Sequence, residues 1–296
     1  MRNRVSERCI VRKIDYIDIL SGTSDLCGLD RGNLSSFDFK KLRTSHSNRL
    51  ATAYEWYDWP ELMRVEKRYL RPDYNAATAY ATGDEVYYST ADKYYQALSA
   101  STGNVPTNAT YWKEVARVTD FDPYISLEQV GETVIGAVYA LYNKDPLRYE
   151  TVTEYDWHLS NNGIQLTDNK TLAYVEFRLR PPVLSGDTWS STKTYSIGDQ
   201  VYFSDSTTKG NFYDCTTATN LTDSPSSAAA KWTKVDIPYI FGRYLTQAGY
   251  ADYLTTDQQG ERKAQEELFA TELLTNQVTL IAGQQGQYRR VAVSTR

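Results

Sequence analysis

The sequence predicts an α+β protein with a helical core formed by its N- and C-terminal segments, a central β domain, and two small three-stranded β modules inserted between them. Three observations lead to this prediction. Apolar residues recur at helical spacing near both ends of the chain, a pattern of short strands occurs twice, and alternating apolar residues fill the stretch between the two copies.

The composition is that of a globular protein. Of the 296 residues, 41% are hydrophobic and 23% are charged, which is too apolar for wholesale disorder. The sequence has no run of about 18 apolar residues that would suit a membrane span, and no secretory signal follows Met1. We therefore expect a soluble chain of two or three domains with no membrane partner. The formal net charge of −5 argues against broad coating of nucleic acid.

Residues 1–72 are predicted to be the N-terminal helical part of the core. Ser36 suits an N-cap, and the positions expected to face the core follow at steps of three and four residues: Phe39, Leu42, His46, Leu50 and Ala53 or Tyr54. A break at Trp59-Pro60-Glu61 precedes a second helical stretch with Leu62, Val65 and Tyr69, which Pro72 ends.

An internal repeat is the most informative feature of the sequence. Residues 74–87 match residues 189–202 position for position, and Trp112 corresponds to Trp232 further on. The repeat defines two modules, residues 73–117 and residues 187–236, each with the order turn, strand, turn, strand, loop, strand. Both are close to the size, about 40 residues, below which a domain needs a partner.

The repeated Gly-Asp, Val, Tyr, Pro and Trp positions carry a resemblance. They are similar to small chitin- and cellulose-binding modules of the family 5/12 type, which occur on secreted glycosidases and in virion proteins of tailed bacteriophages. The likeness covers about a third of the chain. Where those modules place exposed tryptophans after the second strand, this chain has Leu98-Ser99-Ala100 and Thr216-Thr217-Ala218.

Residues 118–186 are predicted to form a central β domain with its own sheet. Residues 134–139 and 174–179 have strand patterns, the second stopped by Pro181-Pro182. Asn162-Gly163 predicts a hairpin between residues 157–159 and residues 164–166.

Residues 237–283 are predicted to supply the C-terminal helices of the core. Apolar positions from Phe241 to Leu254 fit one helix, Gly260 offers a joint, and positions from Ala264 to Val278 fit a second helix. Residues 284–296 are expected to be a polar tail that becomes ordered on assembly, because they hold too few apolar residues to fold alone.

Few residues of the chain suit catalysis or metal binding. It has two histidines, His46 and His158, and three widely spaced cysteines, so the usual general bases and zinc ligands are scarce. The closely spaced carboxylates, such as Asp120 with Asp122, are typical of turns and surfaces more than of a glycosidase. We expect no enzyme activity, no cofactor and no metal. The Gly-Asp pairs at Asp84 and Asp199 are interpreted as turns, with a calcium or sugar ligand as the alternative.

Aromatic side chains are the main candidates for binding, since the chain has 25 Tyr, 6 Trp and 8 Phe. Four of them are candidates either for stacking on sugar rings or, the favoured interpretation, for packing inside the module cores: Tyr74, Trp112, Trp189 and Trp232. Two basic clusters are candidates for assembly contacts or for transient contact with packaged DNA in a channel. They comprise Arg64, Lys67, Arg68 and Arg71, and, near the end of the chain, Tyr288, Arg289 and Arg290. A solvated helix face is the commoner explanation for such runs.

Residues outside the modules carry a wider resemblance. Residues 53–62 before the first module, residues 175–182 before the second, and residues 250–254 with 263–267 resemble a family of tailed-phage structural proteins found among head-to-tail genes. The likeness extends over nearly the whole chain. It implies a head-to-tail connector, adaptor or neck subunit in a homo-oligomeric ring, with the portal and other neck or tail proteins as partners. It also implies a place in the virion after synthesis in the host cytoplasm.

The sequence therefore predicts a structural virion protein that forms a ring next to the portal. The alternative is a glycan-binding adhesin or tail-tip protein whose two modules gain affinity by acting together. An accessory subunit of a secreted enzyme is a third interpretation, which the missing signal peptide disfavours.

Overall fold

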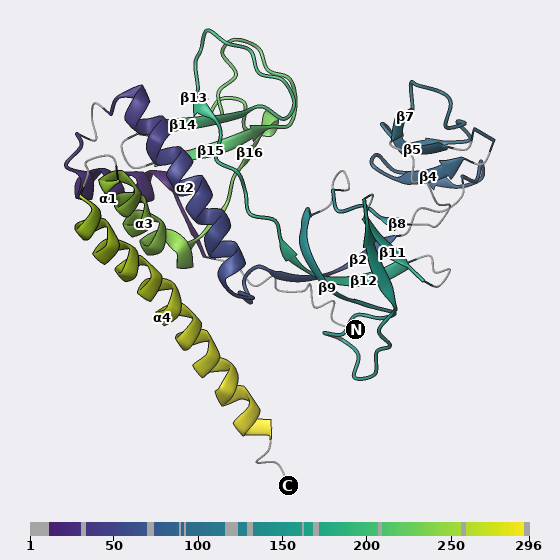
Figure 1. The fold of residues 1–296 in the computed structure, drawn as a ribbon. Helices are drawn as coiled ribbons and strands as arrows, with labels where there is room; N and C mark the ends of the chain where they lie inside the picture. Colours follow the sequence, from purple (N-terminus) through teal and green to yellow (C-terminus); the bar gives the residue numbers. More distant parts are fainter. Residues whose placement is uncertain are drawn as a thin grey trace, which may run out of the picture. The chain divides into compact units, whose positions relative to one another are not determined.

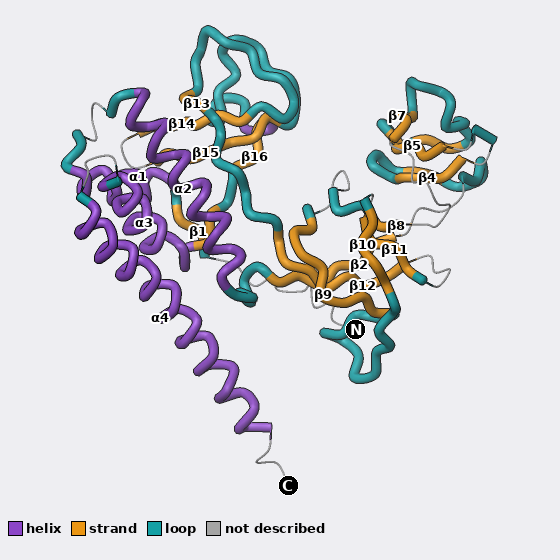
Figure 2. The backbone as a smooth tube through the Cα atoms, in the orientation of Figure 1, coloured by secondary structure: helices purple, strands orange, loops and turns teal. Residues whose placement is uncertain are grey.

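The computed structural model describes residues 12–30, 34–69, 74–88, 90–91, 93–115, 124–128, 133–161, 163–167, 172–206, 209–255 and 259–292; Tyr69, Ser206 and the last nine of these residues are described by their backbone. In these residues the chain is a mixed α+β protein with four α-helices and several small sheets (Figure 1, Figure 2). It divides into two compact units. Unit 1 joins residues 1–61 to residues 181–296, and unit 2 comprises residues 62–180.

Unit 1 contains the helices and one four-stranded sheet. The helices are α1 (Tyr16–Cys27), α2 (Ser36–Trp56), α3 (Gly242–Leu254) and α4 (Gly260–Ala292), with short 3₁₀ helices η2 (Ala229–Lys231) and η3 (Tyr239–Phe241). The sheet has the order β13 (Asp187–Thr188), β14 (Gln200–Ser206), β15 (Lys209–Cys215), β16 (Trp232–Lys234). A two-residue pair, β1 (Lys13–Ile14) with β17 (Ile237–Pro238), joins the segment before α1 to the segment before α3.

Local sequence sets the ends of these helices. The N-cap of α2 is Ser35, whose hydroxyl accepts the N–H of Asp38 at 3.0 Å, so the cap lies one residue before the predicted Ser36. α1 is closed by Gly28, which has a φ of 69°, a backbone conformation that favours glycine at this position. Gly260 begins α4, where the sequence predicts a joint between two helices.

The helices from the two ends of the chain share one apolar interior. α3 packs against α1, α2 and α4. Trp59, just after α2, is fully buried, and its ring meets the ring of Phe241 edge-on with 5.4 Å between the centroids. The indole N–H of Trp59 donates to the carbonyl of Ala53 at 2.7 Å, so this large side chain is buried without an unsatisfied polar group.

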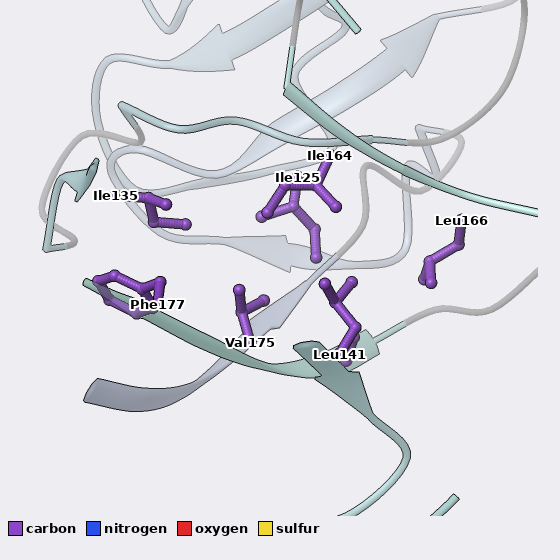
Figure 3. Packing of buried hydrophobic residues seen from close by; sticks show 8 residues of the cluster. Ile125, Ile135, Leu141, Ile164, Leu166, Val175 and Phe177 are labelled. Carbon is purple, nitrogen blue, oxygen red and sulfur yellow. The ribbon is translucent and has the colours of Figure 1, made fainter. Parts of the chain in front are cut away.

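Unit 2 holds two antiparallel three-stranded sheets around one core (Figure 3). Their orders are β2 (Met63–Tyr69), β12 (Leu172–Leu179), β9 (Ile135–Tyr142), and β10 (Trp157–Ser160), β11 (Gly163–Leu166), β8 (Tyr124–Ile125). The core consists of eight buried apolar residues: Ile125, Ile135, Leu141, Ile164, Leu166, Ala173, Val175 and Phe177. β10 and β11 are the hairpin that the sequence predicts, with Asn162 itself outside the described residues.

The first repeat belongs to unit 2 and forms a sheet of its own. It has the order β4 (Glu85–Tyr88), β5 (Lys93–Ala97), β7 (Trp112–Val115), beside a short pair of β3 (Ala79–Tyr80) with β6 (Ser101–Thr102).

The prediction of a second helical stretch after Pro60 is wrong. Residues 63–69 form strand β2, which pairs with β12 along its whole length. The spacing of Leu62, Val65 and Tyr69 is helical, but in so short a stretch the spacing of apolar residues does not distinguish a helix from a strand. Hydrogen bonding to β12 makes this stretch a strand. The N-terminal helical part therefore ends before residue 62 rather than at residue 72, and residues 181–186 belong to unit 1 rather than to the central β domain.

The predicted polar tail is also corrected in part. α4 continues to Ala292, so the backbone of residues 284–292 is helical. Gln and Arg, which are good helix formers, are common in this stretch, and it contains no proline.

Candidate functional site

The two repeats have the same framework of hydrogen bonds. The N–H of Gly83 donates to the carbonyl of Ala97 at 2.8 Å, and the N–H of Gly198 donates to that of Cys215 at 2.9 Å. Both glycines have a positive φ, 94° and 91°, which other residues rarely adopt. The hydroxyl groups of the matching tyrosines accept backbone N–H groups in the same way, Tyr80 from Asn75 at 2.7 Å and Tyr195 from Ser190 at 2.8 Å.

The aspartates that follow these glycines close turns. The Oδ2 atom of Asp84 accepts the N–H of Ala81, and Oδ2 of Asp199 accepts the N–H of Ser196, both at 2.7 Å. This is the Asp turn that the sequence favours over a calcium or sugar ligand. Within the described parts of the chain, no group of three or more His, Cys, Asp or Glu residues is arranged to hold a metal ion.

Two of the four candidate aromatic residues lie in the module cores. Trp112 is 2% exposed and Trp232 is 6% exposed. Their indole N–H groups donate to backbone carbonyls, Trp112 to Asn104 at 2.8 Å and Trp232 to Asp223 at 3.3 Å. With both faces and the polar edge of each ring engaged, these tryptophans are poorly placed to stack on a ligand.

The other two candidates begin a row of three aromatic rings in each repeat. In the first repeat the ring centroids of Tyr74 and Tyr88 are 5.6 Å apart, and those of Tyr88 and Tyr95 are 6.3 Å apart, with both contacts edge-on. The second repeat has the matching row Trp189, Phe203 and Tyr213, with centroid distances of 5.7 Å and 6.4 Å.

The first ring of each row contains a buried polar atom without a hydrogen-bond partner among the described residues. The atoms are the hydroxyl oxygen of Tyr74 and Nε1 of Trp189. Burial, together with the neighbouring Tyr80 and Tyr88, raises the pKa of the Tyr74 hydroxyl, which keeps it a neutral donor. Such unsatisfied groups are rare in folded proteins, and the same position carries one in both repeats.

The opposite face of the second repeat is fixed to the helices of unit 1. The ring of Phe212 lies 4.7 Å from that of Tyr16 in α1, and the ring of Tyr202 lies 5.0 Å from that of Phe39 in α2. Phe212 is 1% exposed, so this contact belongs to the interior of the unit.

Polar contacts surround this apolar interface. The side-chain oxygen of Asn211 accepts the N–H of Tyr16 at 2.9 Å, and Lys234 donates to Asp15 at 2.6 Å. Burial raises the pKa of Asp15, but the bonds from Lys234 and Asn211 outweigh it and lower the pKa overall. On the α2 side, Arg43 pairs with Asp187 at 2.8 Å.

The first repeat uses the equivalent face within unit 2. Tyr87 and Tyr94 occupy the positions of Tyr202 and Phe212, and the ring of Tyr94 lies 5.6 Å from that of Tyr124 in β8. Packing against Tyr124 leaves Tyr94 2% exposed, so this ring is part of the interior of unit 2.

The first basic cluster is divided by the strand on which it lies. Alternation along β2 places Arg64 and Arg68 on one face and Lys67 on the other, and Arg71 lies outside the described residues. Arg68 is 1% exposed and donates to Glu66 at 2.8 Å and to the carbonyl of Thr133 at 2.7 Å. A common solvated helix face is therefore ruled out for this cluster.

α4 extends well past the part of unit 1 on which it packs (Figure 1). Leu274, 1% exposed, is its last buried residue, and no described side chain between Thr275 and Gly283 is buried. Leu280 in this stretch is 61% exposed. Tyr288, Arg289 and Arg290 lie on the helical backbone beyond it.

Arg49 fixes the packed part of α4. From α2, its guanidinium donates to both carboxylate oxygens of Asp252 in α3, at 3.0 and 2.6 Å, and to both of Glu267 in α4, each at 2.6 Å. The hydrogen bonds to Asp252 raise the pKa of Arg49. Three helices are thus held by one side chain.

Comparison with known proteins adds no identification to this geometry. No family model, curated protein or solved structure matches the chain. Among the described residues, no helix is both long enough and apolar enough to cross a lipid bilayer. The functional argument therefore rests on the residues themselves.

The sequence signals two of these features and misses two. The repeat identifies the framework and the aromatic rows, since both follow from matched positions. It gives no sign of the contact between Phe212 and Tyr16, or of the role of Arg49, because each joins segments about 200 residues apart.

Proposed function

We propose that this chain is a structural virion protein of a tailed bacteriophage, a head-to-tail connector or neck subunit that acts as part of a ring beside the portal. The observation that carries the proposal is the second half of α4, which leaves the helical body of unit 1 with apolar side chains exposed. Isolated helices are marginal in water, so a long one with little packing of its own is typical of a subunit that is completed by a neighbour. The resemblance of the sequence to head-to-tail proteins supports a tailed-phage virion as the particle to which the subunit belongs.

In this proposal the function is mechanical. The helices of unit 1 form the body of the subunit, and the contacts of the second repeat with Tyr16 and Phe39 make that repeat a fixed part of the body. Within unit 2, the first repeat packs on β8 through Tyr124.

Cryo-electron microscopy of the portal vertex and the tail in intact particles tests the location. We expect density for the chain as a ring between portal and tail. Density at the distal tail tip or in fibres would contradict the connector proposal.

Deletion of residues 283–296 tests the role of α4 in assembly. We expect the shortened chain to keep its thermal transition and to lose only the circular dichroism of the removed end of α4, because the last buried residue of α4 is Leu274, but to fail to enter particles. A normal yield of infectious particles with the shortened chain would argue against this role.

Glycan binding by the two repeats is the second candidate, and the paired aromatic rows favour it. Each row is partly exposed and carries one buried hydrogen-bonding group without a partner among the described residues. Sugars combine apolar faces with hydroxyl groups, so they suit a partly exposed ring, and a sugar hydroxyl that reached the buried donor would satisfy it.

Conservative variants separate this candidate from a structural role. Tyr74→Phe and Trp189→Phe remove the unpartnered groups while they keep a ring at each position. If the rows bind glycan, the double variant should lose retention on insoluble chitin or cellulose with an unchanged melting temperature. Equal retention of the wild type and the double variant, or no retention of the wild type, would speak against glycan binding. The control is Leu147→Ala, an exposed position outside the two repeats, which should bind like the wild type.

A further inference from the structure

α4 has a second apolar stripe beside the one that packs within unit 1. Ala270 and Leu274 belong to the packed stripe and are 0% and 1% exposed. Each has an apolar neighbour one residue earlier, Phe269 and Leu273, and a step of one residue turns these side chains about 100° away around the helix. Phe269 is 45% exposed, and Leu280, seven residues after Leu273, is 61% exposed. The second stripe is therefore accessible along the body of the unit and beyond it.

The second stripe has the spacing of a coiled-coil seam. Steps of four and three residues alternate along the residues that we call the α4 seam: Phe269, Leu273, Asn276, Leu280 and Gly283. Asn276 is exposed, and a Cβ on Gly283 would meet no atom of the described residues within 4 Å, so this side of the helix is open. A seam with this period fits the side of another α-helix.

The charge pattern of α4 indicates which helix fits. Residues 273–288 contain no Asp, Glu, Lys or Arg. Identical helices that lie parallel and in register bring identical side chains together, so charges along such a contact would repel each other. Asn276 has the opposite property, because an amide both donates and accepts and can therefore pair with the same amide of a second copy. The uncharged seam with one central amide is suited to a copy of itself.

The charged residues of α4 lie before this stretch, where the helix packs on its own chain. Glu266, three residues before Phe269, accepts a hydrogen bond from Gln247 of α3, and Glu267 accepts from Arg49 of α2. These carboxylates are thus engaged within unit 1, and the seam begins where they end.

We infer that α4 packs on α4 of neighbouring copies of this chain, parallel and in register along the α4 seam, an inference that rests on the proposed function as an assembling subunit. Leu273 and Leu280 meet their counterparts and provide the buried contact. Asn276 hydrogen-bonds to its counterpart, which fixes the register at some cost in stability. A parallel contact in register relates the copies by rotation about an axis along the helices, so the assembly that it builds is cyclic and closed.

Single cysteine variants test the register directly. In the inferred contact the two copies of residue 280 face each other, so Leu280→Cys should form a disulfide-linked dimer when a thiol oxidant such as diamide is added. Leu268→Cys is the matched control, since residue 268 is 64% exposed on the same helix but does not belong to the seam. It should form no more dimer than the wild type, which sets the background from the native cysteines.

Sedimentation velocity measures what the seam contributes to assembly. Leu280→Glu places like charges opposite each other in the contact, and we expect it to raise the apparent dissociation constant of the oligomer about tenfold or more. Leu268→Glu carries the same substitution outside the seam and should assemble like the wild type. Both positions are exposed, so both variants should keep the melting temperature of the wild type.

Any of three results would overturn the inference: a wild type that stays at the monomer mass of 33.8 kDa over the accessible concentration range, equal disulfide formation at residues 268 and 280, or unweakened assembly of Leu280→Glu. The location of the chain in particles is measured separately by electron microscopy. A ring at the neck that forms normally from Leu280→Glu would reject this contact and leave the proposed function in place. Density at the tail tip, together with a disulfide specific to residue 280, would support the contact and reject the connector.

Discussion

At the scale of single residues, the buried His46 decides how the interior of unit 1 responds to acid. It is fully buried, with Nε2 3.0 Å from the hydroxyl of Thr23 and Nδ1 3.1 Å from the hydroxyl of Tyr16. Thr23 donates its own proton to the carbonyl of Ile19, so it accepts from Nε2–H, and Nδ1 accepts from Tyr16. A Cβ on Gly249 would lie 2.4 Å from Nε2, so only glycine fits beside this ring.

Burial lowers the pKa of His46 from its ordinary value of 6.5 to about 4. Between pH 6.5 and pH 4, His46 therefore binds a proton in the unfolded chain but not in the folded chain. The neutral, buried His46 contributes fully to the free energy of unfolding above about pH 6.5, and this contribution falls as the pH decreases toward 4. We predict a loss of unfolding free energy on the order of 3 kcal/mol over that range.

Urea unfolding of the wild type and of His46→Gln at intervals from pH 7.5 to 4.5 measures this effect. The variant is expected to be less stable at pH 7 but to show a flatter dependence on pH, because its side chain does not titrate. An identical slope in both proteins would show that another group is responsible.

At the scale of elements, local patterns predict most of the helices and strands, and tertiary contacts decide the others. The helical spacing from Phe39 to Tyr54 and the joint at Gly260 correspond to α2 and to the start of α4. β2 is missed because its seven residues acquire their state from pairing with β12, more than 100 residues later. The aromatic rows follow from the repeat, but the burial of Tyr94 depends on Tyr124, which no repeat position signals.

The packing of α2, α3 and α4 depends on Arg49 as a shared partner. Burial raises the pKa of Asp252, but the bonds from Arg49 and Ser45 lower it overall, so this carboxylate is charged near neutral pH. We predict that Arg49→Met lowers the unfolding free energy by roughly 2 kcal/mol, because two partly buried carboxylates then lose their common donor.

Chemical unfolding at pH 7 measures the loss. Lys93→Met is the control, since Lys93 and Glu114 form an exposed pair whose removal should change stability little. If both variants were equally stable, the ion pairs of Arg49 would contribute no more to the free energy of unfolding than the exposed pair of Lys93.

At the scale of the whole molecule, the sheets of the two repeats pack on the rest of their own units through the same face. In the second repeat Tyr202 and Phe212 pack on α1 and α2, and in the first Tyr87 and Tyr94 pack toward β8. Each repeat thus completes a different unit, which agrees with the expectation that a module of this size needs a partner. The shared face explains why the aromatic rows, on the other face, stay partly exposed in both copies.

The boundary between the units leads to a last prediction, about independent folding. The strands of both sheets in the core of unit 2, including β2, lie within residues 62–180, and Leu62 and Arg68 are each 1% exposed. We therefore expect a fragment of residues 62–180 to unfold cooperatively in calorimetry. A fragment of residues 74–180 should show no such transition, because β12 loses its antiparallel partner β2 along seven residues and the core loses one side of its sheet. The second fragment is the matched control for the first, since both contain the first repeat and the same core residues. Equal transitions in the two would mean that β2 is a dispensable edge strand, and that the unit begins after residue 72 as the sequence alone suggests.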